Sequence, residues 1–180
     1  KDIFWYAYGV KSKWDRFRAM LGGFDFFFVD RWGGKTVISD DLEIGIPRMW
    51  GGNSAEDMRC SVVGAGGKYT KNIFTVARRQ KLIWDSELVF KGRWQLSSAS
   101  LTGVNAFSMG GYYGVIDNRG YPRAQTYGDS GYSFNTGLVF PPYFIPKDVG
   151  VPFSKGKLYD CLQLFTFFDW GVQGGLWITL

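Results

Sequence analysis

The stretch from Trp84 to Ser97 reads WDSELVFKGRWQLS, and it alternates between two kinds of side chain. Its even-numbered positions are mostly apolar and include a tryptophan near each end, whereas its odd-numbered positions carry four charges and a glutamine. A period of two places successive side chains on opposite faces of a β-strand. This stretch therefore predicts a strand with one apolar face and one polar face.

Six further segments can hold strands of this kind. Gly33-Gly34 predicts a hairpin turn, and residues 79–82 predict a second short turn. No stretch combines helical periodicity with helix caps, so we expect an all-β protein with a curved antiparallel sheet of about seven or eight strands. The six segments are Ile38–Ile46, Gly131–Phe140 and Tyr159–Gly171, which alternate clearly, and Ile3–Val10, Arg16–Asp30 and Arg59–Arg79, which alternate less clearly.

Two environments suit such strands. In a soluble protein the apolar face covers a core, whereas in an antiparallel transmembrane β-barrel it meets lipid and the polar face lines the lumen. The composition is compatible with the barrel: 19% of the residues are aromatic, and the mean hydropathy is -0.12, near the zero expected of alternating strands. No run approaches the roughly 20 apolar residues of a membrane helix. The side chains expected on the outer, lipid-facing surface are Trp84, Leu88, Phe90, Trp94, Phe134, Leu138, Leu164 and Phe168.

Charge and composition argue against several classes of function. The net charge is +5, yet Lys and Arg are scattered along the chain, unlike the clustered basic face of a nucleic-acid-binding protein. There is no His, and no nucleophile motif, metal-ligand spacing or phosphate-binding loop appears. We therefore expect no enzyme activity and no cofactor or metal ion. Cys60 and Cys161 lie far apart, and the sequence leaves open whether they form a disulfide.

The longest irregular stretch runs from Leu101 to Ser130, and loops of this length in a compact fold usually serve a function. Short connections near residues 33 and 80 alternate with longer ones, as in outer-membrane barrels, although the connection after Pro141 is long where a short turn is due. Three motifs lie along this stretch in order: Gly110-Gly111; Asn118-Arg119-Gly120-Tyr121; and Gly128-Asp129-Ser130-Gly131, which opens the next strand. That strand ends in a fourth motif, Leu138-Val139-Phe140-Pro141. One strand later come Phe167, Asp169 and Gly171, all on the polar phase of the alternation.

In order and spacing, these motifs resemble those of the two-partner secretion transporters, also called TpsB or haemolysin activator/secretion proteins. This family belongs to the superfamily of the barrel-assembly protein BamA, whose members carry a Val-Arg-Gly-Phe/Tyr motif in a long loop that folds back into the barrel. Here Asn118 stands where the family usually has Val. The resemblance covers residues 69–171, and before residue 69 it rests on the strand pattern alone.

The resemblance implies a structure and a task. Arg119 in the loop would contact the barrel-wall motif of Phe167, Asp169 and Gly171, with Tyr121 nearby. The chain would be part of a monomeric barrel in the outer membrane of a Gram-negative-type bacterium, where it secretes an unfolded exoprotein such as an adhesin or cytolysin. Its partners would be that passenger and outer-membrane lipid. Residues 1–180 would form part of a C-terminal barrel domain, without the family's POTRA domains and final strands.

Two other functions stay open on sequence grounds. A barrel-assembly factor of the same superfamily would share the loop motif, although the Gly128–Gly131 element favours the transporter. A soluble, aromatic-rich β-sheet that binds sugars would explain the alternation but not the series of motifs. A requirement for detergent would separate the soluble module from the two membrane proteins.

Overall fold

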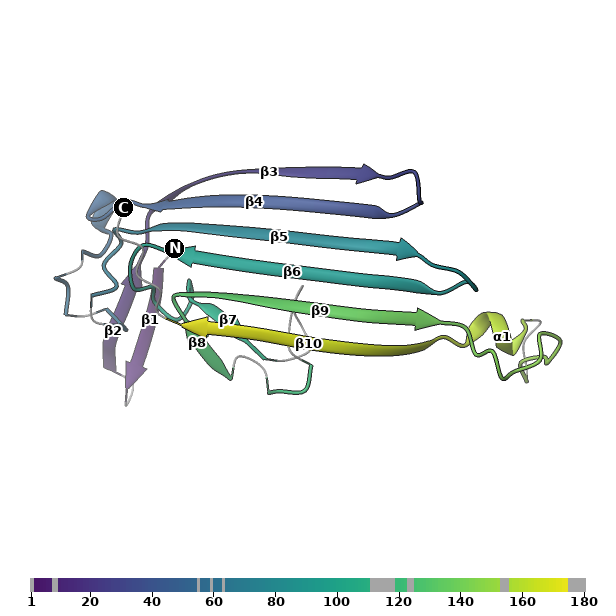
Figure 1. Cartoon of the computed structure of the whole chain (residues 1–180). Coiled ribbons are helices and arrows are strands. Elements are labelled where there is room, and N and C mark those ends of the chain that lie inside the picture. The colour runs from purple at the N-terminus through teal and green to yellow at the C-terminus, as the bar shows by residue number, and fades with distance from the viewer. Residues whose placement is uncertain are drawn as a thin grey trace.

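The computed structural model describes residues 2–7, 10–54, 56–58, 60–62, 64–110, 119–122, 125–152 and 156–174, with side chains from residue 13 onward. Within these ranges the protein is all-β and antiparallel, as predicted (Figure 1). None of the described helices has the length and apolar character needed to cross a lipid bilayer. The elements are β1 (Asp2–Ala7), β2 (Val10–Arg16), β3 (Ala19–Val29), β4 (Lys35–Gly45), the 3-10 helix η1 (Met49–Gly51), β5 (Thr70–Lys81), β6 (Glu87–Ser97), β7 (Phe107–Met109), β8 (Thr126–Gly128), β9 (Ser130–Phe140), α1 (Leu158–Cys161) and β10 (Leu164–Gly174).

The strands form one six-stranded sheet and two small ribbons instead of one sheet of seven or eight strands. The sheet has the order β10-β9-β6-β5-β4-β3, and the ribbons are β1-β2 and β7-β8. The β1-β2 ribbon leaves the sheet because the backbone after β2 pairs elsewhere: the carbonyl of Arg16 accepts a hydrogen bond from Asn53 N, and that of Arg18 accepts one from Ile46 N. The edge strands β3 and β10 are not paired with each other, so the sheet stays open.

The hairpin between β5 and β6 lies later in the chain than predicted. β5 continues to Lys81, and the turn comprises residues 82–86, with Trp84 and Asp85 in the left-handed region at φ of 57° and 54°. Arg79 lies in the strand opposite Val89, and its side chain pairs across the hairpin with Glu87, Nε to Oε2 at 2.7 Å. Trp84 therefore lies in an exposed turn, and its predicted place on the outer face is wrong. The Gly33-Gly34 hairpin is present, with Gly33 at φ 73°.

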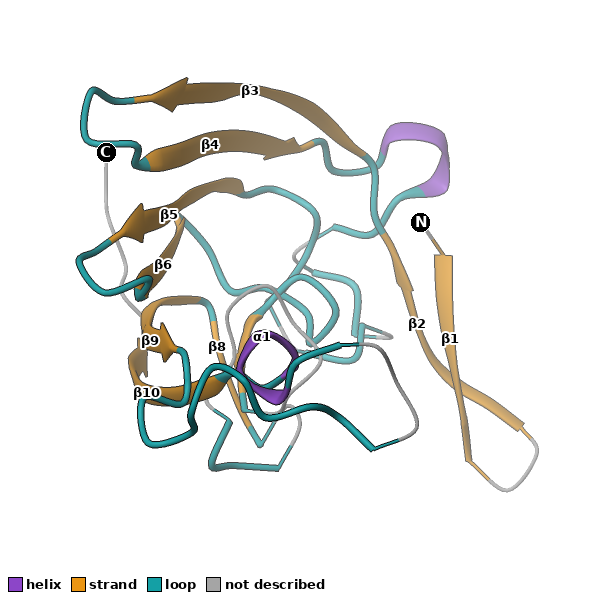
Figure 2. Ribbon diagram, turned by 90° about the vertical axis from the view of Figure 1, so that its right-hand side faces the viewer, coloured by secondary structure: helices purple, strands orange, loops and turns teal. Residues whose placement is uncertain are grey.

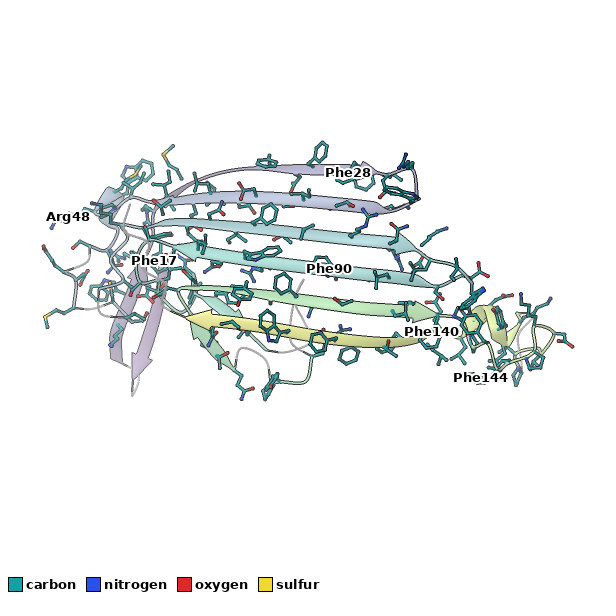
Figure 3. All side chains as sticks on the ribbon, in the orientation of Figure 1. Phe17, Phe28, Arg48, Phe90, Phe140 and Phe144 are labelled. Atoms are coloured by element: carbon teal, nitrogen blue, oxygen red, sulfur yellow. The ribbon has the colours of Figure 1, made fainter. Side chains whose placement is uncertain are left out.

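The connection between β9 and β10 is long and structured. It includes α1, so the strand predicted from Tyr159 begins only at Leu164. The Tyr143 hydroxyl donates a hydrogen bond to the Trp84 carbonyl and lies 2.7 Å from the Ser86 hydroxyl, which ties this connection to the β5-β6 turn. Figure 3 shows Phe144 in this region, at the opposite end of the sheet from Arg48 and Phe17.

All six strands of the sheet share one phase. Opposite residues in an antiparallel pair point to the same face, and every register joins positions of equal parity, for example Asp40 with Phe74 and Phe74 with Trp94. The even-numbered residues therefore form one face, which we call the apolar face, and the odd-numbered residues form the other, which we call the polar face. Apart from Trp84, the predicted outer residues lie together on the apolar face: Leu88, Phe90, Trp94, Phe134, Leu138, Leu164 and Phe168.

Aromatic rings in contact run across the apolar face from β5 to β10. Trp94 lies edge-on to Phe134 with ring centroids 5.0 Å apart, and Phe134 stacks on Trp170 at 6.0 Å. The charged groups on this face are hydrogen-bonded to neighbours: Asp40 accepts a bond from Asn72 Nδ2 at 2.7 Å, and Arg78 pairs with Asp30 in the β3-β4 turn.

Burial on the sheet does not follow the pattern of a soluble sheet. The apolar face lies open, with Phe24 60% and Phe168 69% exposed, whereas Gln95 and Ser133 on the polar face are buried; at the edge strands, Phe27 and Phe165 of the polar face are also exposed. A soluble protein buries apolar side chains and exposes few large apolar patches. The buried apolar residues gather where loops meet one end of the sheet: Phe17, Cys60, Ala65, Tyr69, Leu101 and Phe107.

The sheet curves around the connection between β6 and β9, which lies on its concave side (Figure 2). Phe107 and Met109 of this connection contact the polar face at Gly131 and Gly171, so the concave side is the polar side.

Cys60 and Cys161 are both free thiols, on connections at opposite ends of the strands. Burial, followed by the charges of Asp57 and Asp15, raises the pKa of the Cys60 thiol.

Candidate functional site

The Gly128–Gly131 motif joins the two ends of the long loop. The Asp129 carboxylate accepts hydrogen bonds from Leu101 N at 2.7 Å and from Ser100 Oγ at 3.4 Å. The Ser130 hydroxyl accepts one from Ser97 N at 3.0 Å and is buried. The last residue of β6 is thereby fixed to Ser130, the first residue of β9, and the first residues of the loop are fixed to Asp129 just before it. We call the described residues 98–109 and 126–131 the loop root.

Two glycines allow the loop root to lie directly on the sheet. A Cβ on Gly131 would lie 2.5 Å from the ring of Phe107 and 2.8 Å from the carbonyl of Val172. A Cβ on Gly171 would lie 2.7 Å from Met109 Sδ and 3.1 Å from the carbonyl of Tyr132. Contacts below 3 Å force neighbouring groups apart, so a side chain at either position would displace the β7 segment from the polar face.

A second attachment holds the loop farther along its length. Asp169 Oδ2 accepts hydrogen bonds from Arg119 N at 3.0 Å and from Arg119 Nε at 2.9 Å, and Oδ1 accepts one from Arg119 Nη2 at 2.7 Å. Asn135 Nδ2 donates a further bond to Oδ1 at 2.9 Å. The guanidinium carbon lies 3.8 Å from the centroid of the Phe167 ring. We call Arg119, Asn135, Phe167 and Asp169 the Arg119 clamp.

The geometry of the clamp favours arginine specifically. A planar guanidinium can bind both oxygens of a carboxylate and stack on an aromatic ring at the same time, which the ammonium of lysine cannot do. The Asp169 side chain is 6% exposed and that of Arg119 is 27% exposed. Exposed ion pairs contribute about 0–1 kcal/mol, and breaking a buried pair costs about 3–5 kcal/mol. The clamp lies between these limits, and its main effect is to fix where the loop sits.

The contact predicted between Arg119 and Asp169 is present, with Phe167 beside it. Asn118 lies outside the described residues. Tyr121 is 60% exposed, and none of the described contacts joins it to the clamp, although it was predicted nearby. A Cβ on Gly120 would meet nothing within 4 Å. A Cβ on Gly110, at φ 105°, would collide with the carbonyl of Pro122, so a glycine is needed there.

Sequence reasoning missed two polar side chains that complete the site. Asn135 joins the clamp, and Gln95 Nε2 donates to the carbonyls of Asn105 and Asp129, each at 3.2 Å. Both residues belong to the polar phase of their strands, and that phase was the signal available in the sequence. Their partners come from distant parts of the chain, which alternation does not identify.

The arrangement attaches the loop to the sheet. Among the described residues, no group of three or more Cys, Asp or Glu side chains is placed to hold a metal ion. Each charge of the Arg119–Asp169 pair is matched by its partner. Compared with protein-family models, with curated proteins and with solved structures, the chain gives no match.

Proposed function

We propose that this chain forms part of the wall and the inner loop of an outer-membrane pore that secretes an unfolded exoprotein in two-partner secretion. One observation carries the proposal: the Arg119 clamp holds the loop on the concave, polar face of a sheet whose other face is apolar and open. A loop in this place would lie within the lumen once further strands pair with β3 and β10. In that barrel the apolar face meets lipid, and the open edges disappear.

The unequal ends of the sheet support an orientation. Connections 46–69 and 98–129 leave one end, whereas the other end carries the short turns after β3 and β5 and one exception, the long β9-β10 connection that includes α1. Outer-membrane barrels place long loops outside the cell and short turns in the periplasm. The loop root therefore belongs at the cell-surface end, and the passenger would enter from the end that carries α1.

The proposal is tested by secretion of the cognate passenger, using the full-length protein in the outer membrane. Arg119→Ala should leave the protein folded and inserted, as judged by heat-modifiable migration, while secretion falls at least about tenfold. Asp169→Ala should act likewise, and the double variant should be little worse than either single one, because the two residues act as one unit.

The matched control is Arg48→Ala, which removes an arginine whose ion pair with Glu56 is highly exposed. It should leave secretion unchanged. Secretion at the parental level in Arg119→Ala would sink the proposal. A barrel-assembly factor would give a different pattern, in which Arg119→Ala lowers the amounts of other outer-membrane barrels and not one secreted protein.

A further inference from the structure

A cluster of buried polar groups lies on the polar face away from the Arg119 clamp. Lys71 Nζ lies 2.6 Å from Glu43 Oε2, and these side chains are only 6% and 16% exposed. The other oxygen of Glu43 accepts a hydrogen bond from the Tyr69 hydroxyl. Asn105 Nδ2, from the long loop, donates to that hydroxyl at 3.1 Å. We call Glu43, Tyr69, Lys71 and Asn105 the root network.

The backbone prepares a place for the Tyr69 ring. A Cβ on Gly45, at the end of β4, would lie 2.6 Å from two carbons of this ring, so the glycine makes room for it. Burial, together with the neighbouring Glu43 carboxylate, raises the pKa of the Tyr69 hydroxyl. The hydroxyl therefore keeps its proton and can donate it to Glu43 while it accepts a bond from Asn105.

The root network continues into the loop root. The backbone carbonyl of Asn105 accepts a hydrogen bond from Gln95 Nε2, which also donates to the backbone carbonyl of Asp129. A chain of hydrogen bonds thus runs from β4 and β5, through Asn105, to β6 and the Gly128–Gly131 motif. Arg93 adds a contact, with its guanidinium carbon 5.2 Å from the centroid of the buried Phe107 ring.

The burial of the Lys71–Glu43 ion pair needs a physical explanation. Removing Lys71 and Glu43 from water is costly, and packed apolar side chains would often be at least as stable. Buried polar networks can instead select one arrangement, because any other leaves a donor or acceptor unpaired. Here the root network selects the arrangement in which residues 101–109 pack against the polar face of the sheet.

We propose that Glu43, Tyr69, Lys71 and Asn105 are positioning residues that anchor the loop root to the sheet independently of the Arg119 clamp. The two attachments use different strands: the root network uses β4 and β5, and the clamp uses β9 and β10. Loss of one therefore leaves the other in place. The inference depends on the proposed function only in assuming that the loop acts inside a secretion pore.

Hydrogen exchange in the full-length protein tests this independence, and it needs no passenger. The amides of Leu101, Asn105 and Ala106 are hydrogen-bonded in the loop root, and that of Arg119 reports the clamp. Tyr69→Phe, which removes one oxygen and keeps the ring, should speed exchange of the root amides about tenfold, the effect of roughly one hydrogen bond. The Arg119 amide should change less than about twofold. Asp169→Ala should give the reverse pattern.

Tyr127→Phe is the matched control, since Tyr127 lies exposed in the same loop; it should change neither group of amides. Asn105→Ala, which leaves the wall intact, should reproduce the effect of Tyr69→Phe. The inference is overturned if Tyr69→Phe and Asn105→Ala leave the root amides unchanged, or if Asp169→Ala loosens both groups together. Because the readout is exchange, a failure of the secretion test would not be mistaken for a failure here.

Discussion

The two faces of the six-stranded sheet belong to the same strands and are covered in opposite ways. On the polar face, Gln95, Ser133 and Asn135 are buried; Gln95 donates hydrogen bonds to loop carbonyls, and Asn135 donates one to Asp169 of the clamp. On the apolar face, aromatic rings lie open with no second layer of described residues over them. The comparison teaches that the loop builds a buried polar layer on one face, whereas no described residue covers the other; in the proposed barrel, lipid would cover that apolar face.

The largest expected effect compares the faces at neighbouring positions of β5. Val76→Arg would place a charge in the middle of the apolar face and should destabilise the protein in lipid by about 2–4 kcal/mol. Ala77→Arg would place the same charge on the polar face, opposite Lys91. It should cost at most about 1 kcal/mol, mostly from repulsion between like charges. Urea unfolding in lipid vesicles measures both, and equal costs would remove the distinction between the faces.

A smaller effect compares two glycines of β9 that share the polar face. Gly131→Ala should destabilise the protein by about 1–3 kcal/mol, because the new methyl group meets Phe107 and the backbone of Val172. Gly137→Ala is the control, since its nearest neighbour would be an oxygen 3.6 Å away. It should be neutral or slightly stabilising. Denaturant midpoints of the two variants check this, and a neutral Gly131→Ala would show that the loop is not seated there.

The smallest expected effect is a dependence on pH at the β3-β4 turn. The Asp30 carboxylate bonds to Arg78 and accepts further hydrogen bonds from Gly34 N and Trp32 N. These bonds lower the pKa of the Asp30 carboxyl. A lowered pKa in the folded state means that the contribution to stability is present above the unfolded value of about 3.9. It is lost as the pH falls through the lower, folded pKa. Exchange of the Gly34 amide should therefore accelerate at acid pH beyond its intrinsic change, and Asp30→Asn should abolish that excess.

Much of the sheet could be predicted because its signal is local. Alternation within each strand placed Phe134, Trp94 and Asp169 on their faces without knowledge of their neighbours, and the registers then kept one parity across six strands. The contact of Arg119 with Asp169 followed from that phase and from the family motif. Both predictions depended on residues whose positions in the sequence already carry the pattern.

What could not be predicted depends on distant partners. Residues 79–81 continue β5 because they pair with residues 87–89 across the hairpin, and the turn therefore lies at Trp84 and Asp85. The root network joins Glu43, Tyr69 and Asn105 from three separate segments, and no spacing links them. The β1-β2 ribbon left the sheet because residues 16–18 pair with the connection after β4.

The central claim is that the apolar face meets lipid and the polar face meets water. It is tested most directly by spin labels on cysteines placed singly at residues 73–77 of β5, in full-length protein lacking Cys60 and Cys161 and reconstituted in lipid vesicles. We expect a period of two: labels at Phe74 and Val76 collide with oxygen dissolved in lipid, and labels at Ile73, Thr75 and Ala77 collide with a water-soluble nickel chelate. Equal access of the nickel chelate to all five positions would contradict the account and would make this a water-soluble sheet.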